Sequence, residues 1–247
     1  MPLCLAVAQP RLPSVKLAPE TSAVFDRYVA QAEARLENTD ARNSKLRGGE
    51  VRIESVGVPG DMKAPGGMIQ DWIGTMFVRG ATLDQARAVL EDYADYKNIY
   101  APKAIESKLL ARHADEYDVF LRLYEKHILS VVLNTTYRVR YSMPDSHRLT
   151  VTSYSTRIAE VKDPDRSYDE ELPVGNDSGF LWRLNTYWRF QSADGGVYAR
   201  CEAISLSRDV PFGLGWMLKG FLEGFPKDSM MNTLRGTREA MLKRHAG

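Results

Sequence analysis

The residues with the clearest chemical potential lie in one segment, Gly179 to Ser229, which is typical of a β-hairpin followed by a helix. Arg183, Asn185, Tyr187 and Arg189 recur there at every second position, so they share one face of the first strand. Guanidinium groups on an inward-pointing face could bind a carboxylate or a phosphate. Because buried arginines are costly unless they are paired, we instead predict an outer, solvated face with cross-strand charge pairs.

The opposite face of this strand is aromatic, and we predict that it points toward the C-terminal helix. Its residues are Phe180, Trp182, Leu184, Trp188 and Phe190. A turn is predicted over Ser192 to Gly196, and the returning strand then sets small residues opposite the aromatic ones, namely Ala199, Cys201, Ala203 and Ser205. Large side chains that face small ones leave room, which a helix, a ligand or both could fill.

Acid–base, nucleophilic and metal chemistry find less support in the sequence. Asp92 and Asp95 could form an acid–base pair, but solvation at a helix end is the favoured interpretation. Cys201 is interpreted as a buried structural thiol. Four histidines lack the spacing of metal ligands and lie near the ends of elements: His113, His127, His147 and His245. We therefore predict no catalytic residues, no metal site and no cofactor.

Composition excludes some classes of partner. The 247 residues include 33 basic and 32 acidic side chains, a formal net charge of +1, so bulk charge does not favour nucleic acid. No apolar run approaches the ~20 residues of a membrane span. Two cysteines, Cys4 and Cys201, provide no disulfide framework.

The first residues allow two interpretations. Leu3 to Ala8 is apolar and ends in Ala-Val-Ala, like a signal-peptidase site, although no Lys or Arg precedes it. The segment is either a frayed, Pro-rich terminus or the remnant of a signal peptide. We expect a cytoplasmic protein in the first case and an exported one in the second.

The elements that position these residues follow from periodicity and from turn signals. In the first part of the chain we predict a helix over Glu20 to Leu46, a short strand over Val51 to Val56 and a strand over Met68 to Arg79. A helix then begins at Thr82, with a capping box to Gln85. The apolar stripe of this helix continues through Tyr93, Tyr96 and Tyr100 into a second short helix, which Pro102 ends.

The second part predicts an antiparallel meander that leads to the hairpin. Its strands are expected over Ala104 to Arg112, Glu116 to Lys126, Leu129 to Ser142 and His147 to Val161. Lys162 to Ser178 is predicted as a long acidic loop, either solvated or folded as a flap over a cavity mouth. After the hairpin we expect a short apolar helix over Leu214 to Gly224 and a closing helix over Pro226 to Lys243.

This order predicts an α+β fold in which a curved antiparallel sheet wraps around a long C-terminal helix, with an extra N-terminal helix. We divide the chain into an irregular segment (1–19), a helix with its linking segment (20–66) and a main domain (67–247).

The order of elements and several short phrases resemble the helix-grip superfamily, the SRPBCC or START-like lipid-transfer and polyketide-cyclase-like proteins. The phrases are GATLD at Gly80 to Asp84, LEDYADY at Leu90 to Tyr96, AIES at Ala104 to Ser107 and SRDVP at Ser207 to Pro211. The resemblance covers about Met68 to Lys243. It implies a hydrophobic ligand held between the sheet and the C-terminal helix, and it carries over no catalytic residue.

Large apolar and aromatic side chains are the candidates for a cavity wall. Any one of these side chains would be expected in a packed core, but so many of them together favour an adaptable pocket of ~300–1,000 Å³. We predict that the wall contains Trp72, Tyr96, Tyr100, Tyr137, Trp182, Leu184, Trp188, Ala203, Met217, Phe221, Met230 and Leu234. The Lys162 to Ser178 loop or the Tyr96 to Pro102 corner should lie near the mouth.

Three hypotheses for function follow. The favoured one is a non-catalytic binder or carrier of a hydrophobic small molecule: a lipid, an isoprenoid or a polycyclic aromatic compound. The second is a cyclase, aromatase or hydrolase that uses the same cavity, and the third is a module whose groove receives a partner segment. Transient membrane contact is compatible with the first, and the oligomeric state stays open.

Overall fold

The computed structural model describes residues 12–37, 39–42, 46, 50–57, 62–126, 130–209 and 215–244, of which 215–225 are described by their backbone. The predicted signal remnant at Leu3 to Ala8 and the histidines His127 and His245 lie outside these ranges.

The described helices and strands keep the order of the predicted ones and include four short strands that were not predicted. They are β1 (Val15–Lys16), α1 (Pro19–Glu37), β2 (Val51–Ser55), β3 (Lys63–Ala64), β4 (Gly67–Arg79), α2 (Leu83–Glu91), α3 (Tyr96–Ile99), β5 (Ala104–His113), β6 (Glu116–Lys126), β7 (Ser130–Asp145), β8 (Arg148–Asp163), β9 (Ser167–Glu171), β10 (Asn176–Asp177), β11 (Arg183–Ala193), β12 (Gly196–Arg208) and α4 (Gly215–Lys243).

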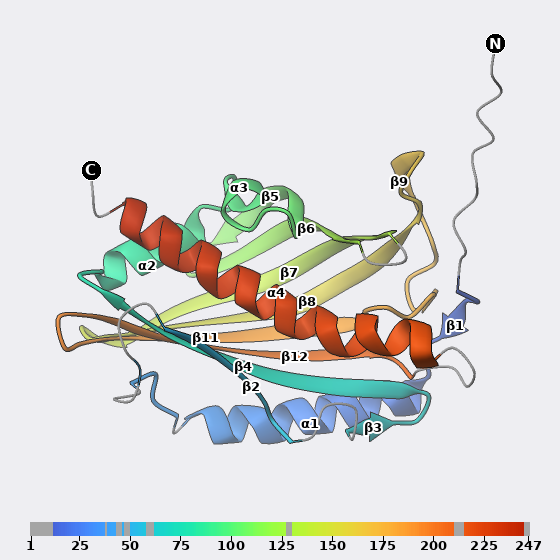
Figure 1. Cartoon of the computed structure of the whole chain (residues 1–247), viewed down its shortest axis with the longest axis horizontal. Helices are drawn as coiled ribbons and strands as arrows, with labels where there is room; N and C mark the ends of the chain where they lie inside the picture. The colour runs from blue at the N-terminus through green and yellow to red at the C-terminus, as the bar shows by residue number, and fades with distance from the viewer. Residues whose placement is uncertain are drawn as a thin grey trace, which may run out of the picture.

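One antiparallel sheet dominates the molecule. Its strands lie in the order β2-β4-β12-β11-β8-β7-β6-β5, and β3 and β9 pair additionally with β4 and β8. Register shifts within the β5–β6 and β7–β8 ladders are of the kind that bend a sheet. Figure 1 shows α4 crossing one face of the sheet, with α2 and α3 beside it, and α1 running along the other face. The predicted curved sheet around a C-terminal helix is confirmed.

Local sequence signals explain how the cavity-forming elements begin and turn. The Thr82 hydroxyl accepts from the backbone N–H of Gln85, and the Gln85 side chain accepts from the backbone N–H of Thr82, which is the predicted capping box at the start of α2. The β11–β12 turn is shorter than predicted, because Asp194 and Gly195 alone adopt positive φ, at 53° and 72°. The aromatic and small residues nevertheless lie opposite each other as predicted, with Trp188 paired to Cys201.

Three predicted boundaries are wrong. The helix predicted to Leu46 ends at Glu37, where Thr39 donates to the backbone oxygens of Leu36 and Arg35. The two helices predicted after the hairpin are one, α4, with Pro226 inside it. A proline removes one backbone hydrogen bond, which a long helix packed on a sheet tolerates. The predicted loop at Lys162 to Ser178 contains β9, paired with β8, and β10, paired with β1.

The arginine-bearing face of β11 is not solvated as predicted, because α1 covers it. Tyr187 is buried there, and its hydroxyl donates to Glu33 of α1 at 2.9 Å. The Arg189 guanidinium donates to the backbone oxygen of Leu36, and burial lowers the pKa of Arg189. Sequence periodicity identified the two faces of the strand but could not show that a helix from the N-terminal segment would cover the outer one.

A cluster of charged side chains joins α1 to the neighbouring strands β4 and β12. Arg35 of α1 forms ion pairs with Asp71 of β4, at 3.2 Å, and with Glu202 of β12. Both carboxylates are fully buried, whereas the Arg35 side chain is 43% exposed. The Tyr28 hydroxyl donates to Asp71 at 2.8 Å, and Arg200 pairs with Glu202 at 2.9 Å. We call these five residues the α1 charge cluster.

Candidate functional site

A cavity lies between the inner face of the sheet and the helices that cover it. Its volume is about 230 Å³. The wall contains Gln70, Leu90, Tyr93, Tyr96, Tyr100, Lys103, Ala104, Val119, Leu121, Leu123, Tyr137, Val139, Tyr141, Val151, Ser153, Phe180, Leu181, Leu184, Thr186, Trp188, Cys201, Ala203, Ser205, Ser207, Pro226, Ser229, Met230, Asn232 and Thr233. The volume falls below the predicted ~300–1,000 Å³.

The register of the strands arranges the floor of the cavity in rows. The apolar row consists of Tyr141, Val151, Trp188 and Cys201, which are paired in succession across β7, β8, β11 and β12. The middle row consists of Val139, Ser153, Thr186 and Ala203. The polar row contains Tyr137, Leu184, Ser205 and Gln70, with Ser205 paired to both Leu184 and Gln70. Ser207 faces the same side one alternation further along β12.

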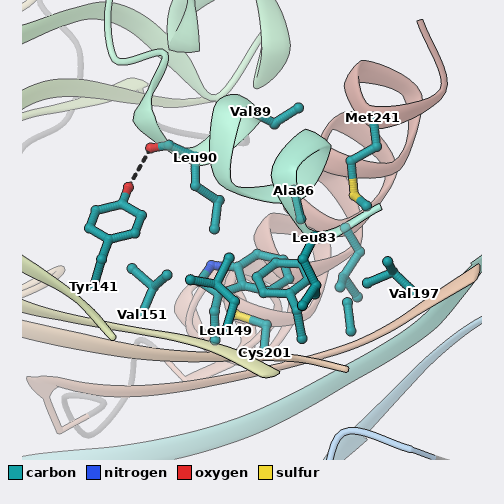
Figure 2. Close-up of a cluster of buried hydrophobic side chains, with 14 of the residues drawn as sticks. Leu83, Ala86, Val89, Leu90, Tyr141, Leu149, Val151, Val197, Cys201 and Met241 are labelled. Atoms are coloured by element: carbon teal, nitrogen blue, oxygen red, sulfur yellow. Dashed lines mark hydrogen bonds between the residues drawn. The ribbon is translucent and has the colours of Figure 1, made fainter. Parts of the chain in front are cut away.

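Helix α2 closes the cavity beside the apolar row. Leu90 and Tyr93 line this end, and the Tyr141 hydroxyl contacts the backbone oxygen of Leu90 at 2.7 Å and the Tyr93 hydroxyl at 2.7 Å. Figure 2 shows the Tyr141–Leu90 hydrogen bond beside a packed group of side chains from α2, the sheet and α4. Burial raises the pKa of Tyr141 and of Tyr93, so both rings stay neutral.

The corner formed by α3 and the start of β5 provides another part of the wall. The Tyr96 and Tyr100 rings lie 4.8 Å apart, and the Tyr100 hydroxyl lies 3.1 Å from that of Thr237 on α4. Asn232 of α4 donates to the backbone oxygen of Tyr100 at 2.9 Å, and burial raises the pKa of Tyr100 to about 12. Of the two segments predicted near the mouth, the wall includes residues of this corner and no residue of Lys162 to Ser178.

The corner depends on a close helix contact at Gly236, which gives a testable prediction. A Cβ atom at Gly236 would lie 2.3 Å from the backbone oxygen of Ile99 and 3.1 Å from the Tyr100 ring. Although alanine is the better helix former by ~1 kcal/mol, overpacking against backbone outweighs this gain. Gly236→Ala is expected to lower the free energy of unfolding by about 1–2 kcal/mol in urea denaturation. The exposed neighbour Arg235→Ala is the control, and a more stable Gly236→Ala variant would contradict the prediction.

Charge is nearly absent from the cavity wall. Lys103 is the one charged residue of the described wall, and its ammonium donates to Glu125 at 2.6 Å. Burial raises the pKa of the Cys201 thiol, which favours the protonated form over the thiolate that nucleophilic attack requires. Burial also raises the pKa of Tyr137 to about 12. The site thus offers apolar surface and neutral polar groups, and no poised acid, base or nucleophile among its described residues.

The hydroxyls of Tyr137 and Ser207 are buried without a hydrogen-bond partner among the described residues. Tyr137 is 5% exposed and Ser207 is 4% exposed. A buried hydroxyl without a partner destabilises a fold by ~1–3 kcal/mol, so such groups call for a specific explanation.

The structure brings part of the predicted wall together. Tyr96, Tyr100, Tyr137, Leu184, Trp188, Ala203 and Met230 line the cavity. The side chains of Met217 and Phe221 lie outside the described ones. Trp72 and Leu234 are in the packed core instead, since Leu234 sits directly over Gly74, where any Cβ would be only 2.4 Å from it. Ala199 is also core rather than wall.

Trp182 lies on the wrong side of the sheet for the predicted role. It precedes β11, packs with Phe25 and Leu206 beneath α1, and donates its indole N–H to Asp177 at 3.0 Å. Strand alternation does not extend through the irregular residues before β11, so Phe180 reaches the cavity and Trp182 does not. Conversely, Val119, Leu121 and Val139 were missed, although alternation along β6 and β7 identifies them.

Other predicted groups lie away from the site. Asp92 and Asp95 are at helix ends, where Asp92 pairs with Arg244 and Asp95 accepts from Asn98. His113 and His147 are exposed at strand ends. Among the described residues, no three potential metal-ligating side chains of His, Cys, Asp or Glu gather at one place. No helix in the described ranges has both the length and the apolar character needed to cross a membrane.

Comparison with known proteins identifies the fold. The sequence matches no family model and no curated protein. A fragment of the STAR-related lipid transfer protein from Xanthomonas axonopodis superposes with a TM-score of 0.54 at 17% identity, over 82% of this chain and 97% of that one. Human STARD10 superposes with a TM-score of 0.52 at 14% identity, over 93% of this chain and 82% of that one. At these identities the similarity shows the fold.

Proposed function

From the helix-grip fold that this chain shares with a STAR-related lipid transfer protein, we propose that it binds a hydrophobic small molecule between its sheet and α4. The observation that carries the proposal is the cavity itself, which aromatic and aliphatic side chains line and which α2, α3 and α4 cover. The name of the X. axonopodis protein supports a lipid as the class of ligand.

The size of the cavity sets the scale of the interaction. At ~30 Å³ for each water-sized group, a volume of about 230 Å³ accommodates roughly eight non-hydrogen atoms. Burial of each methylene contributes ~0.8 kcal/mol, so an eight-carbon chain gains ~6 kcal/mol before the cost of association. This proposal therefore concerns a small ligand, or the part of a larger one that enters the cavity.

The experiment that tests the proposal has two arms. The purified protein is extracted with organic solvent and the extract is examined by mass spectrometry for a co-purified apolar compound. The delipidated protein is then titrated with N-phenyl-1-naphthylamine, an uncharged dye that fluoresces in apolar surroundings and whose six-carbon phenyl ring is small enough to enter the cavity. Saturable dye binding at one site per chain is expected, and its absence would overturn the proposal.

Filling the cavity should weaken this binding. Ala203 lies in the middle row, paired with Thr186 on one side and Trp72 on the other, and its side chain enters the cavity. Ala203→Phe is expected to weaken dye binding by at least about tenfold, or ~1.4 kcal/mol, because the ring takes the place of the ligand. Thermal unfolding must first show that the variant is folded, since overpacking can cost ~1–3 kcal/mol. Ala111→Phe, on edge strand β5 outside the wall, is the control, and equal loss in both variants would count against the cavity.

A further inference from the structure

The floor of the cavity is graded in polarity from one end to the other. The apolar row lies beneath α2, where the nearby Tyr93 and Tyr141 hydroxyls already bond to each other. The middle row adds the hydroxyls of Ser153 and Thr186, and the polar row adds those of Tyr137 and Ser205 and the Gln70 amide. The strand register alone produces this order, because residues paired across the sheet point to the same side.

The end with the polar row also holds the unpartnered hydroxyls. The Tyr137 and Ser207 oxygens are buried and bond to no described protein group, and both residues belong to the cavity wall. An oxygen atom of a bound molecule would satisfy such groups and remove the penalty of burying them. A pure hydrocarbon would leave them unsatisfied.

The wall also limits the charge of the ligand. The one charged residue of the described wall, Lys103, bonds to Glu125, so it is not free to neutralise an anion. A carboxylate or phosphate drawn fully into the cavity would have no opposite charge there, and burial of an unpaired charge is strongly unfavourable.

We infer that the ligand is an uncharged amphiphile that binds in one orientation. Its hydrocarbon part lies over the apolar row beneath α2, and its hydroxyl or carbonyl oxygen lies at the polar end, where it bonds to the unpartnered hydroxyl of Tyr137 or of Ser207. This inference rests on the proposed function and adds to it the chemical class and the direction of the ligand.

Competition against N-phenyl-1-naphthylamine tests the inference with three probes that share an eight-carbon chain: 1-octanol, n-octane and, at pH 8, octanoate. The inhibition constant of each probe is measured on the wild type, Tyr137→Phe, Ser207→Ala and the double variant. The octanol-to-octane affinity ratio is expected to fall about fivefold in the single variant that removes the hydroxyl to which octanol bonds, and in the double variant, the equivalent of ~1 kcal/mol for one hydrogen bond. Octanoate is expected to bind at least about tenfold more weakly than octanol.

Controls separate this inference from the proposed function and from folding defects. Tyr168→Phe, on β9 outside the wall, should leave the ratio unchanged. Thermal unfolding of Tyr137→Phe and Ser207→Ala should show no loss of stability, because both changes remove only an unpartnered oxygen. The octanol-to-octane ratio is taken within each variant, so any change in its affinity for the dye cancels. If the dye binds but the ratio is the same in all variants, or octanoate competes as well as octanol, the inference is overturned and the proposed function stands. If the dye does not bind the wild type, both the proposed function and this inference are overturned.

Discussion

Replacement of Arg35 by methionine is expected to lower the free energy of unfolding at pH 8 by about 3 kcal/mol. Arg35 pairs with the carboxylates of both Asp71 and Glu202, which are fully buried on adjacent strands. Breaking a buried pair by removing one partner costs ~3–5 kcal/mol, because the other charge is left uncompensated. The lower end of this range applies because the Arg35 side chain is 43% exposed, so water screens part of the interaction.

Urea denaturation at pH 8 and pH 5 measures this effect. The loss should be smaller at pH 5, because the pKa of Asp71 is raised to about 6, so its carboxyl is then already largely protonated and leaves no unpaired anion when Arg35 is removed. Arg27→Met, at an exposed position on the same helix, is the matched control and should change stability by less than about 0.5 kcal/mol. The double variant Arg35→Met/Glu202→Gln should regain part of the lost free energy of unfolding, because it no longer contains the unpaired Glu202 carboxylate. If Arg35→Met is as stable as the control, the cluster does not hold α1.

The second large effect concerns the pH dependence that Asp71 confers. Burial, and then the neighbouring charge of Glu202, raise the pKa of Asp71 from 3.8 to about 6. Below pH 4 the Asp71 carboxyl is protonated in both the folded and the unfolded chain, so it does not change the free energy of unfolding. Between pH 4 and pH 6 only the unfolded chain releases the proton, so the folded state loses stability as pH rises. At ~1.36 kcal/mol per pKa unit, this loss amounts to about 3 kcal/mol above pH 6.

Asp71→Asn removes this titration and keeps an acceptor for the Tyr28 hydroxyl. Relative to wild type, the variant is therefore expected to become more stable by about 3 kcal/mol as pH rises from 4 to 7. Parallel urea titrations at several pH values check this, with Asp228→Asn on the exposed side of α4 as the control. A stability difference that stays constant with pH would show that Asp71 is ionised in the folded chain at pH 4.

These charges bear on the cavity because β4 and β12 have two functional faces. Asp71 and Glu202 point toward α1, and the alternate residues Gln70, Ala203 and Ser205 line the cavity on the other side. The α1 charge cluster therefore joins α1 to the two strands that form one side of the floor. A variant that loosens α1 should also weaken dye binding, although no residue of α1 belongs to the wall.

Much of the site could be predicted where periodicity is strict. Alternation in β11 placed Leu184 and Trp188 toward the helix, and the opposite parity in β12 placed Ala203 beside them. Prediction failed where alternation stops or where several elements compete for the same space. Trp182 follows an irregular segment and turns to the other face, and Leu234 fills the gap above Gly74 that a larger side chain would have closed.

By itself, the sequence determined the element types, the antiparallel order and the division of each strand into two faces, because these depend on neighbouring residues and on a period of two. Only the tertiary structure decided what covers each face. The arginine-bearing face of β11 was predicted to meet water, yet α1, more than 140 residues earlier in the chain, covers it. Arg189 donates to the backbone oxygen of Leu36, and the α1 charge cluster joins α1 to the neighbouring strands β4 and β12. The cavity likewise depends on how α2, α3 and α4 sit above the sheet, and the polarity gradient of its floor arises from register across five strands, which no local pattern encodes.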